Sequence, residues 1–181
     1  SSALEGLLWS EPLGAYCRSL WVNGTQDLRA DSSSVAAIFT GATNNASRMD
    51  SHIKRMIAEL TKLKFGMARY SNDPFFFDSR YNPGGREVGE ASPPWGVTTM
   101  FTAWAEMIAY GKASNSTVAN RLQWMLDHTA PNLMPVGEAV DGVSGEPVMS
   151  SSPDLYEYAG VFMWTLLAQL GIAKPPNPSM W

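Results

Sequence analysis

The chain has 181 residues, of which 45% are hydrophobic and 17% charged, and this composition is typical of a folded globular domain. A net charge of −4 without any basic run argues against nucleic acid or an anionic membrane as a partner. The single cysteine, Cys17, excludes an internal disulfide framework and a cysteine-built zinc site. The two histidines, His52 and His128, are far apart in sequence, so no metal and no other cofactor is expected.

Apolar residues with helical spacing predict most elements of the first half of the chain, and no sustained strand alternation is present. Weak patterns predict helices at about 13–22 and at 34–40, the second ended by Gly41. A clearer stripe predicts a helix over 53–63 with a charged opposite face. The stripe consists of Ile53, Met56, Ile57, Leu60 and Leu63.

The second half contains the strongest helix signals. A stripe over 97–108 follows Ser92-Pro93 and ends at Gly111, as expected of an N-cap, a first-turn proline and a terminating glycine. A shorter stripe occupies 122–126. The last helix, 155–170, is apolar nearly all round, which is typical of a helix buried on both sides. It begins after Ser152-Pro153 and ends at Gly171, ahead of a proline-rich tail at 174–181.

The alternation of buried and half-exposed helices predicts an all-α protein with two concentric helical layers. We expect one helical domain over residues 1–181 that contains about three helical hairpins. The loops at 69–90 and 131–152 are longer than simple connections usually are, and loops of this length tend to be functional. The apolar run at 158–173 is too short and too interrupted to cross a bilayer, so no membrane span is expected.

The first long loop has the residue types of a sugar site. Arg69 and Asp73 are suited to hydrogen bonds with neighbouring hydroxyls, and Trp95 at a helix start can cover the apolar face of a sugar ring. The alternatives are a local ion pair between Arg69 and Asp73, and a Trp95 that belongs to the core. For Trp95 the two interpretations are nearly even.

The second long loop places Glu138 among small residues between two helices. A carboxylate there can face a pocket and accept a proton from water, which is the role of the general base in an inverting glycosidase. The alternative is a solvated loop carboxylate, which is the commoner state of an arbitrary glutamate. Spacing alone does not choose between them.

Several motifs in one order resemble the C-terminal half of the glucoamylase-like glycoside hydrolases, family 15. The family patterns are G-x-x-R-Y-x-x-D, then N-P-W at the start of a helix, then L-P-E-x-x-D-x-x-T-G-x-P, then P-L-x-W-S-x-A. The similarity covers about residues 48–172. The corresponding segments are Gly66-Met67-Ala68-Arg69-Tyr70-Ser71-Asn72-Asp73, Pro94-Trp95, Met134-Pro135-Val136-Gly137-Glu138 through Pro147, and Ser152-Pro153-Asp154-Leu155-Tyr156-Glu157-Tyr158-Ala159.

This resemblance implies an (α/α) toroid and an enzyme that hydrolyses terminal α-glucosidic bonds with inversion. It implies that Glu138 is the catalytic general base, that Arg69 and Asp73 bind sugar hydroxyls, and that Trp95 is a wall of the pocket. In this chain Val136-Gly137 separates the proline from the glutamate, which are usually adjacent in the family. The W-E-E type motif of the family's general acid is missing, and Trp9-Ser10-Glu11 is a poor imitation of it.

The missing acid implies that the chain is the last three hairpins of a six-hairpin toroid. Its expected partners are an oligosaccharide or polysaccharide substrate and either the N-terminal half of the toroid or another copy of the chain. The acceptor patterns Asn23-Gly24-Thr25, Asn45-Ala46-Ser47 and Asn115-Ser116-Thr117 favour a secreted glycoprotein. The competing hypotheses are a non-catalytic helical module that binds carbohydrate or protein, and an unrelated helical hydrolase or lyase.

Overall fold

The computed structural model describes residues 4–60, 96–113, 119–120, 123, 126–127 and 156–172. Most of these residues are helical, and two small antiparallel sheets lie near the N-terminus, so the all-α expectation holds only as mainly helical. The elements are η1 (Leu4–Leu8, a π-helix), β1 (Trp9–Ser10), β2 (Ala15–Tyr16), β3 (Ser19–Leu20), β4 (Gln26–Asp27), η2 (Ser32–Val35, a 3₁₀ helix), α1 (Ala36–Phe39), α2 (Ala46–Leu60), α3 (Gly96–Tyr110) and α5 (Tyr156–Gln169).

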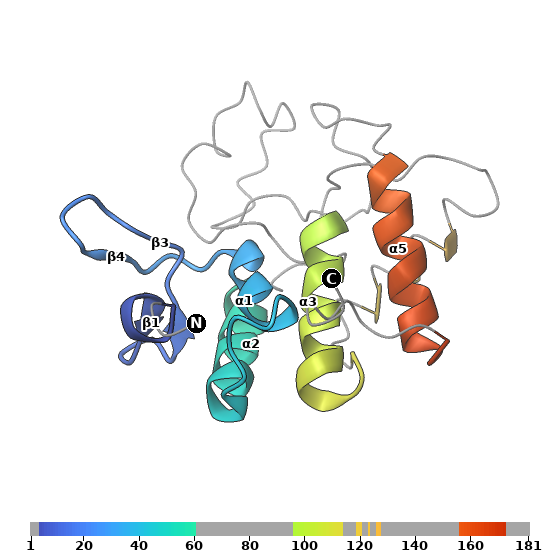
Figure 1. Cartoon of the computed structure of the whole chain (residues 1–181). Helices are drawn as coiled ribbons and strands as arrows, with labels where there is room; N and C mark the ends of the chain where they lie inside the picture. The colour runs from blue at the N-terminus through green and yellow to red at the C-terminus, as the bar shows by residue number, and fades with distance from the viewer. Residues whose placement is uncertain are drawn as a thin grey trace, which may run out of the picture.

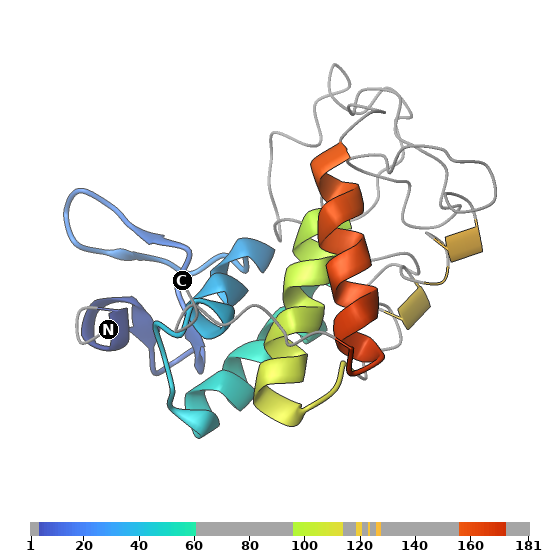
Figure 2. The same cartoon turned by 45° about the vertical axis from the view of Figure 1, so that its right-hand side comes forward.

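Helix α3 lies in the middle of the described structure. It packs against η2, α1 and α2 on one side and against α5 on the other (Figure 1). Helices α3 and α5 run in the same direction, and a turned view shows the same arrangement (Figure 2). Helix α2 runs the opposite way. Its start lies beside the end of α3, where Asp50 accepts a hydrogen bond from Tyr110 at 3.0 Å.

The core divides into two clusters that meet at α3. One joins α1, α2 and the first hairpin, and it includes Val35, Ile38, Ile53, Met56 and Leu60. The other joins α3 to α5 and includes Met100, Ala103, Trp104, Met107 and Phe162. Phe39 and Phe101 pack against both clusters, and their ring centroids are 4.9 Å apart. The α1–α3 contact is therefore aromatic.

The helix predicted at about 13–22 is wrong. These residues instead contribute β2, which pairs with β1, and β3, which pairs with β4. The reason is local turn chemistry, because Asn23-Gly24 is a hairpin signal and aromatic residues such as Trp21 favour strands. Gly14 closes the first hairpin with φ +61°, in the left-handed region that favours glycine.

The other predicted helices are present, with shifted starts. The predicted 53–63 helix is α2, which begins at Ala46, because the Asn45 side chain accepts from the Arg48 N–H at 3.2 Å and caps it. The weak prediction at 34–40 corresponds to η2 and α1, ended by Gly41 at φ +67°. The described residues between 119 and 127 are helical, as the 122–126 stripe predicted.

The predicted stop residues of α3 and α5 are confirmed. Gly111 and Gly171 follow these helices with φ of +79° and +72°. After α5, Ile172 N–H donates to the Leu167 carbonyl and Gly171 N–H donates to the Ala168 carbonyl, which together make a Schellman cap. The starts predicted at Ser92-Pro93 and Ser152-Pro153 lie outside the described residues.

Candidate functional site

All four residues predicted to form the sugar site, Arg69, Asp73, Trp95 and Glu138, lie outside the described residues. The structure therefore neither brings them together nor separates them. It does describe the two helices that follow the predicted site segments. Helix α3 begins at Gly96, directly after Trp95, and α5 begins at Tyr156, after the segment that contains Glu138.

The relative position of α3 and α5 is fixed by a buried hydrogen bond. Trp104 Nε1 donates to Thr165 Oγ1 at 2.8 Å, and both residues lie just past the middle of their helices. Thr165 Oγ1 in turn donates to the Val161 carbonyl at 2.7 Å. Because the helices run in the same direction, their N-terminal ends lie at the same end of the molecule (Figure 1). The segments that contain Trp95 and Glu138 therefore lead into neighbouring helix starts.

A buried polar stripe lies along α3, and the sequence analysis missed it. Thr99, Thr102, Glu106 and Tyr110 recur at spacings of three or four residues, so they share one side of the helix. The first three are buried, and Thr102 Oγ1 donates to the Thr98 carbonyl at 3.0 Å. The available signal was Glu106, the only charged residue in 97–110. Ile108, the last residue of the predicted 97–108 stripe, is exposed.

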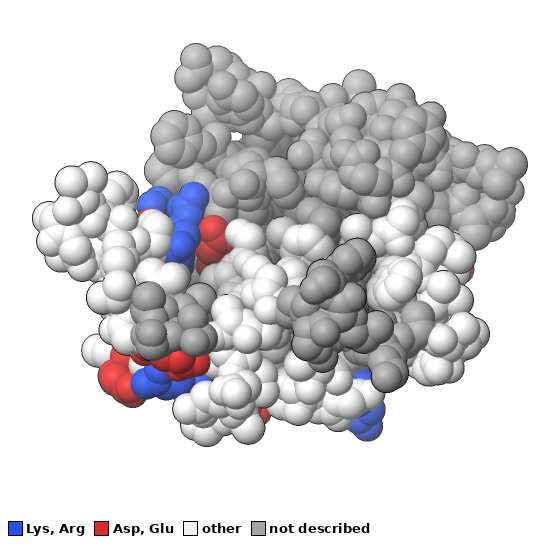
Figure 3. Space-filling model, viewed as in Figure 1, with Lys and Arg blue, Asp and Glu red and all other residues white. Residues whose placement is uncertain are grey.

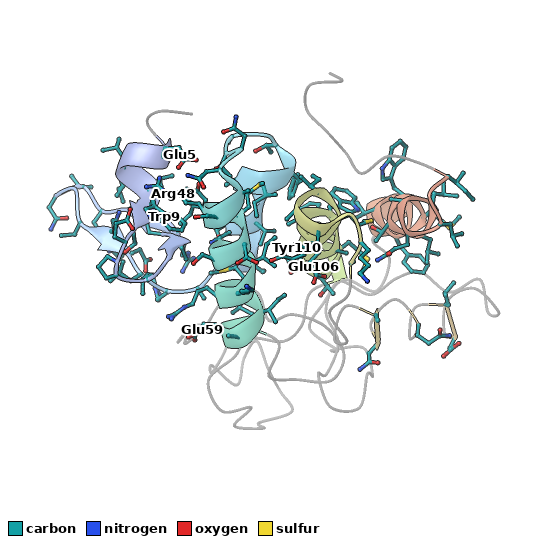
Figure 4. All side chains as sticks on the ribbon, turned by 90° about the horizontal axis from the view of Figure 1, so that it is seen from below. Glu5, Trp9, Arg48, Glu59, Glu106 and Tyr110 are labelled. Carbon is teal, nitrogen blue, oxygen red and sulfur yellow. The ribbon has the colours of Figure 1, made fainter. Side chains whose placement is uncertain are left out.

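Glu106 and Tyr110 lie next to each other between α2 and α3 (Figure 4). Tyr110 donates to Asp50, and Lys54 donates to the same carboxylate at 2.8 Å, so the stripe ends in an ionic contact on α2. Burial, with the carboxylates of Asp50 and Glu106 nearby, raises the pKa of Tyr110 to about 12. Tyr110 is therefore a hydrogen-bond donor at neutral pH and not a base.

Glu106, the buried carboxylate of α3, lies far from the start of that helix. It lies ten residues into α3, which places it about 15 Å from the helix start at 1.5 Å per residue. The two carboxyl groups of an inverting glycosidase are about 6.5–9.5 Å apart across one sugar ring. Glu106 is therefore farther from the start of α3 than these two carboxyl groups are from each other.

His52 is a buried link between η2, α2 and the first hairpin. Its Nδ1 accepts from the Tyr16 backbone N–H at 3.2 Å, and its Nε2 lies 3.2 Å from Ser34 Oγ. Since Nδ1 accepts, the proton of the neutral ring is on Nε2, which donates to Ser34. Burial lowers the pKa of His52 to about 4. His52 is therefore neutral and structural at physiological pH, with both ring nitrogens occupied.

The N-terminal elements are attached to α2 by an ionic cluster. Arg48 donates to the Glu5 carboxylate and carbonyl and to Glu11, and its guanidinium carbon lies 4.7 Å from the centroid of the Trp9 ring. Glu5 also accepts from the Tyr16 hydroxyl at 2.8 Å. Burial raises the pKa of Glu5, but hydrogen bonds with Thr43, Tyr16 and Arg48 lower it overall. Figure 4 shows Glu5, Trp9 and Arg48 grouped at one end of α2. Because the charged groups of Arg48, Glu5 and Glu11 all pair with one another, we interpret the cluster as structural.

The remaining reactive side chain, Cys17, is buried, and burial raises the pKa of its thiol. It is therefore protonated at neutral pH and a poor nucleophile. Among the described residues, no group of three or more His, Cys, Asp or Glu side chains is arranged to hold a metal ion. In the same part of the chain, no helix is both long and apolar enough to cross a membrane.

Comparison with known proteins adds no family assignment. No protein-family model matches the chain, and no curated protein matches it either. Support for a function therefore comes from the residues themselves and from the arrangement of α2, α3 and α5.

Proposed function

We propose that this chain supplies the general base and part of the sugar pocket of an inverting, glucoamylase-like glycoside hydrolase that acts on terminal α-glucosidic bonds. The observation that carries the proposal is that the motif segments, in the order found in the family, precede two helices that run parallel to each other. The segments with Arg69, Asp73 and Trp95, and then the segment with Glu138, lead into α3 and α5. These helices start side by side at one end of the molecule (Figure 1).

Each proposed residue has a chemical role. Glu138 takes a proton from the water that attacks the anomeric carbon, and Arg69 and Asp73 hold sugar hydroxyls through charge-assisted hydrogen bonds. Trp95 packs on the apolar face of the ring. The leaving oxygen needs a proton from a second carboxyl group, and the sequence contains no motif for that acid.

An (α/α) toroid is the fold proposed for the complete enzyme. In such a toroid, inner helices run parallel to one another. Helices α3 and α5, with the described helical residues 119–120, 123 and 126–127 between them in sequence, fit one inner–outer–inner unit. Helix α5 also exposes large apolar side chains, with Met163 53% and Trp164 46% exposed. Exposed apolar area on a helix indicates a surface that another protein part covers. We propose that the N-terminal half of the toroid is that part.

A secreted location is proposed for the enzyme, on the basis of the acceptor patterns at Asn23 and Asn45. Both asparagines are exposed, as an acceptor in a folded secreted protein has to be. The substrate in that location is an oligosaccharide or polysaccharide with terminal α-linked glucose.

The sharpest test separates the base from the acid. Fluoride leaves α-glucosyl fluoride without protonation, so a chain with the base and without the acid is expected to release fluoride from this compound. The same chain is expected to leave maltose intact, because its leaving oxygen needs the acid. A fluoride electrode measures the release, and proton NMR of the first product is expected to show β-glucose, the inverted anomer.

A matched pair of variants assigns the activity to Glu138. Glu138→Gln is expected to lower fluoride release by about 10²–10⁴-fold with sugar binding retained, because general base catalysis contributes that much. Glu146→Gln, in the same loop, is expected to keep the parent rate. Equal rates in the two variants, or release of the α-anomer, contradict the proposed mechanism.

Sugar binding tests the pocket separately from catalysis. Trp95→Ala is expected to weaken binding of malto-oligosaccharides by on the order of 1 kcal/mol, measured by calorimetry, with an unchanged melting temperature. A lower melting temperature with unchanged affinity assigns Trp95 to the core instead. Binding without any Glu138-dependent release of fluoride supports the alternative, a non-catalytic carbohydrate-binding module. No binding at all favours an interaction module or an unrelated helical enzyme.

A further inference from the structure

The β3–β4 hairpin is the most exposed apolar feature near the N-terminus. It extends away from the helices in both views (Figure 1, Figure 2). Residues 19–26 contain no charged side chain, and Figure 3 shows the outer part of this hairpin white. Trp21 is 56% exposed, and Val22 at the tip is fully exposed. A large aromatic side chain in this position indicates a ligand or a modification that covers it.

The tip of the hairpin has a defined turn geometry. Gly24 N–H donates to the Trp21 carbonyl at 2.8 Å, and Trp21 N–H donates to the Thr25 carbonyl at 2.8 Å. Gly24 has φ +82°. These features define a three-residue hairpin loop closed by a left-handed glycine, a loop that is most often built as a type I turn followed by a glycine bulge. The loop residues are Val22, Asn23 and Gly24, so the glycosylation acceptor pattern occupies the turn itself.

The turn brings the side chains of Trp21, Asn23 and Thr25 to one face. Trp21 and Thr25 are opposite each other, one step beyond the Leu20–Gln26 pair of the ladder, and opposite residues of a hairpin project to the same side. Asn23 Oδ1 accepts from the Thr25 backbone N–H at 3.1 Å and from the Thr25 hydroxyl. The Asn23 side chain is thereby held on the Thr25 side, which is also the side of Trp21.

These bonds leave the reactive atom of Asn23 available. Both contacts are to Oδ1, whereas N-glycosylation takes place at Nδ2. Asn23 and Thr25 are themselves exposed, so a sugar joined to Nδ2 enters solvent beside the exposed ring of Trp21. The apolar face of a pyranose stacks on an aromatic ring as other flat apolar surfaces do.

We propose that Asn23 is an N-glycan acceptor and that the first N-acetylglucosamine of the glycan packs on the side chain of Trp21. The donor is an oligosaccharide linked to a polyprenyl diphosphate. Asn23 Nδ2 forms a bond to the anomeric carbon of the sugar, the bond from that carbon to the diphosphate breaks, and Nδ2 loses one proton. The inference is independent of the glycosidase activity and requires only passage through a eukaryotic secretory pathway.

A second acceptor pattern provides an internal control. Asn45-Ala46-Ser47 spans the start of α2, and Asn45 Oδ1 caps that helix by accepting from Arg48 N–H. The residue two positions before Asn45 is Thr43, which is buried, in place of the exposed tryptophan that precedes Asn23. A glycan on Asn45 is therefore expected to gain nothing from stacking.

Occupancy is tested on the full chain secreted from a eukaryotic host behind a signal peptide. Intact-mass and glycopeptide mass spectrometry are expected to find Asn23 glycosylated in most molecules. Asn23→Gln and Thr25→Ala are expected to abolish this glycan, and Thr25→Ser to retain it at lower occupancy. Secreted chain with an unmodified Asn23 overturns the proposal, and it then favours a protein surface as the cover of Trp21.

Stacking is tested with a double-mutant cycle read as melting temperature. Endoglycosidase H leaves the first N-acetylglucosamine on Asn23, whereas peptide-N-glycosidase removes the whole glycan and leaves aspartate. With Trp21 present, the single sugar is expected to raise the melting temperature by about 2 °C relative to the fully stripped chain. Trp21→Ala is expected to remove this difference, and Asn45→Gln to leave it unchanged. The same difference with and without the Trp21 ring overturns the stacking contact.

Discussion

Residues 4–60 and the α3–α5 pair are stabilised in different ways. The N-terminal region has an apolar cluster of its own, and in addition it is held by ion pairs and hydrogen bonds between segments, such as Arg18–Asp31, at 3.2 Å, and the Arg48 contacts with Glu5. On this side of the molecule, basic and acidic atoms lie next to each other (Figure 3). Helices α3 and α5 meet through apolar side chains and the buried Trp104–Thr165 hydrogen bond. The first region should therefore respond to pH, and the second to changes of side-chain volume.

The largest effect is expected from Trp104→Ala. The indole is 8% exposed, it packs against Phe39 and Phe101, and its N–H donates to Thr165. Removal leaves a cavity between α1, α3 and α5 and should cost about 3–5 kcal/mol of unfolding free energy. Urea denaturation measures this cost.

The matched control for Trp104 is Trp164→Ala on α5, where the ring is 46% exposed. Its cost should be about 1 kcal/mol, because nearly half of the removed area is already in contact with water. Equal losses at the two positions would show that burial does not decide the stability of this helix pair.

The second effect is a pH dependence that originates in the N-terminal region. The pKa of His52 is about 4 in the folded chain, compared with an ordinary value of 6.5. Between these values the unfolded chain binds a proton that the folded chain does not, so stability is fully present above pH 6.5 and is lost as the pH falls toward 4. The loss amounts to roughly 3 kcal/mol.

The variant His52→Asn tests this origin, because its amide oxygen can still accept from Tyr16 N–H and does not titrate. The dependence of unfolding free energy on pH between 6.5 and 4.5 should largely disappear in the variant. Glu5 and Asp27, whose pKa values are lowered by their arginine partners and other hydrogen bonds, contribute only at lower pH, below ordinary values of 4.5 and 3.8. An unchanged pH profile in the variant would assign the dependence to other groups.

The smallest expected effect concerns the contact between the first hairpin and α2. Gly14 has φ +61°, and a Cβ there would lie 2.7 Å from Ser51 Oγ, which itself donates to the Gly14 carbonyl at 2.6 Å. Gly14→Ala should cost roughly 2 kcal/mol, from the left-handed backbone and the lost Ser51 hydrogen bond. Thermal denaturation measures it.

Gly171→Ala provides the comparison for Gly14. Its φ is +72°, and a Cβ there meets no atom within 4 Å, so only the backbone contribution remains, about 1 kcal/mol. The difference between the two variants isolates the contact between the hairpin and α2. If the two variants melt at the same temperature, Ser51 moves aside without cost.

Long-range patterns in the sequence predicted the helices better than the hairpins. The apolar stripes of α2 and α3 extend over several turns, so their period is visible in the sequence. Gly111 and Gly171 end their helices as predicted, because the left-handed backbone at a helix end depends on the residue at that position. The two hairpins have strands of only two residues each, which is too short for an alternating pattern to appear. Their signal was the Asn23-Gly24 turn, which was interpreted only as part of a glycosylation pattern.

The polar contacts of the interior were not predictable from spacing. His52 falls on the buried face of α2 beside Ile53 and Met56, but its partners Ser34 and the Tyr16 backbone come from segments distant in sequence. Glu106 was visible as a lone charge, and only the packing of α3 against α2 shows that it is buried. The predicted sugar residues Arg69, Asp73, Trp95 and Glu138 remain predictions, since they lie outside the described residues.

The parallel course of α3 and α5 has an electrostatic consequence. Each helix acts as if about half a positive charge were at its N-terminal end, and in a parallel pair these charges add at one end of the molecule. Helix α2 runs the opposite way, so its own dipole offsets only part of the sum. A carboxylate at that end keeps its negative charge more readily than one at the opposite end. A base that must be ionised to accept a proton from water is favoured there, and an acid that must keep its proton is not.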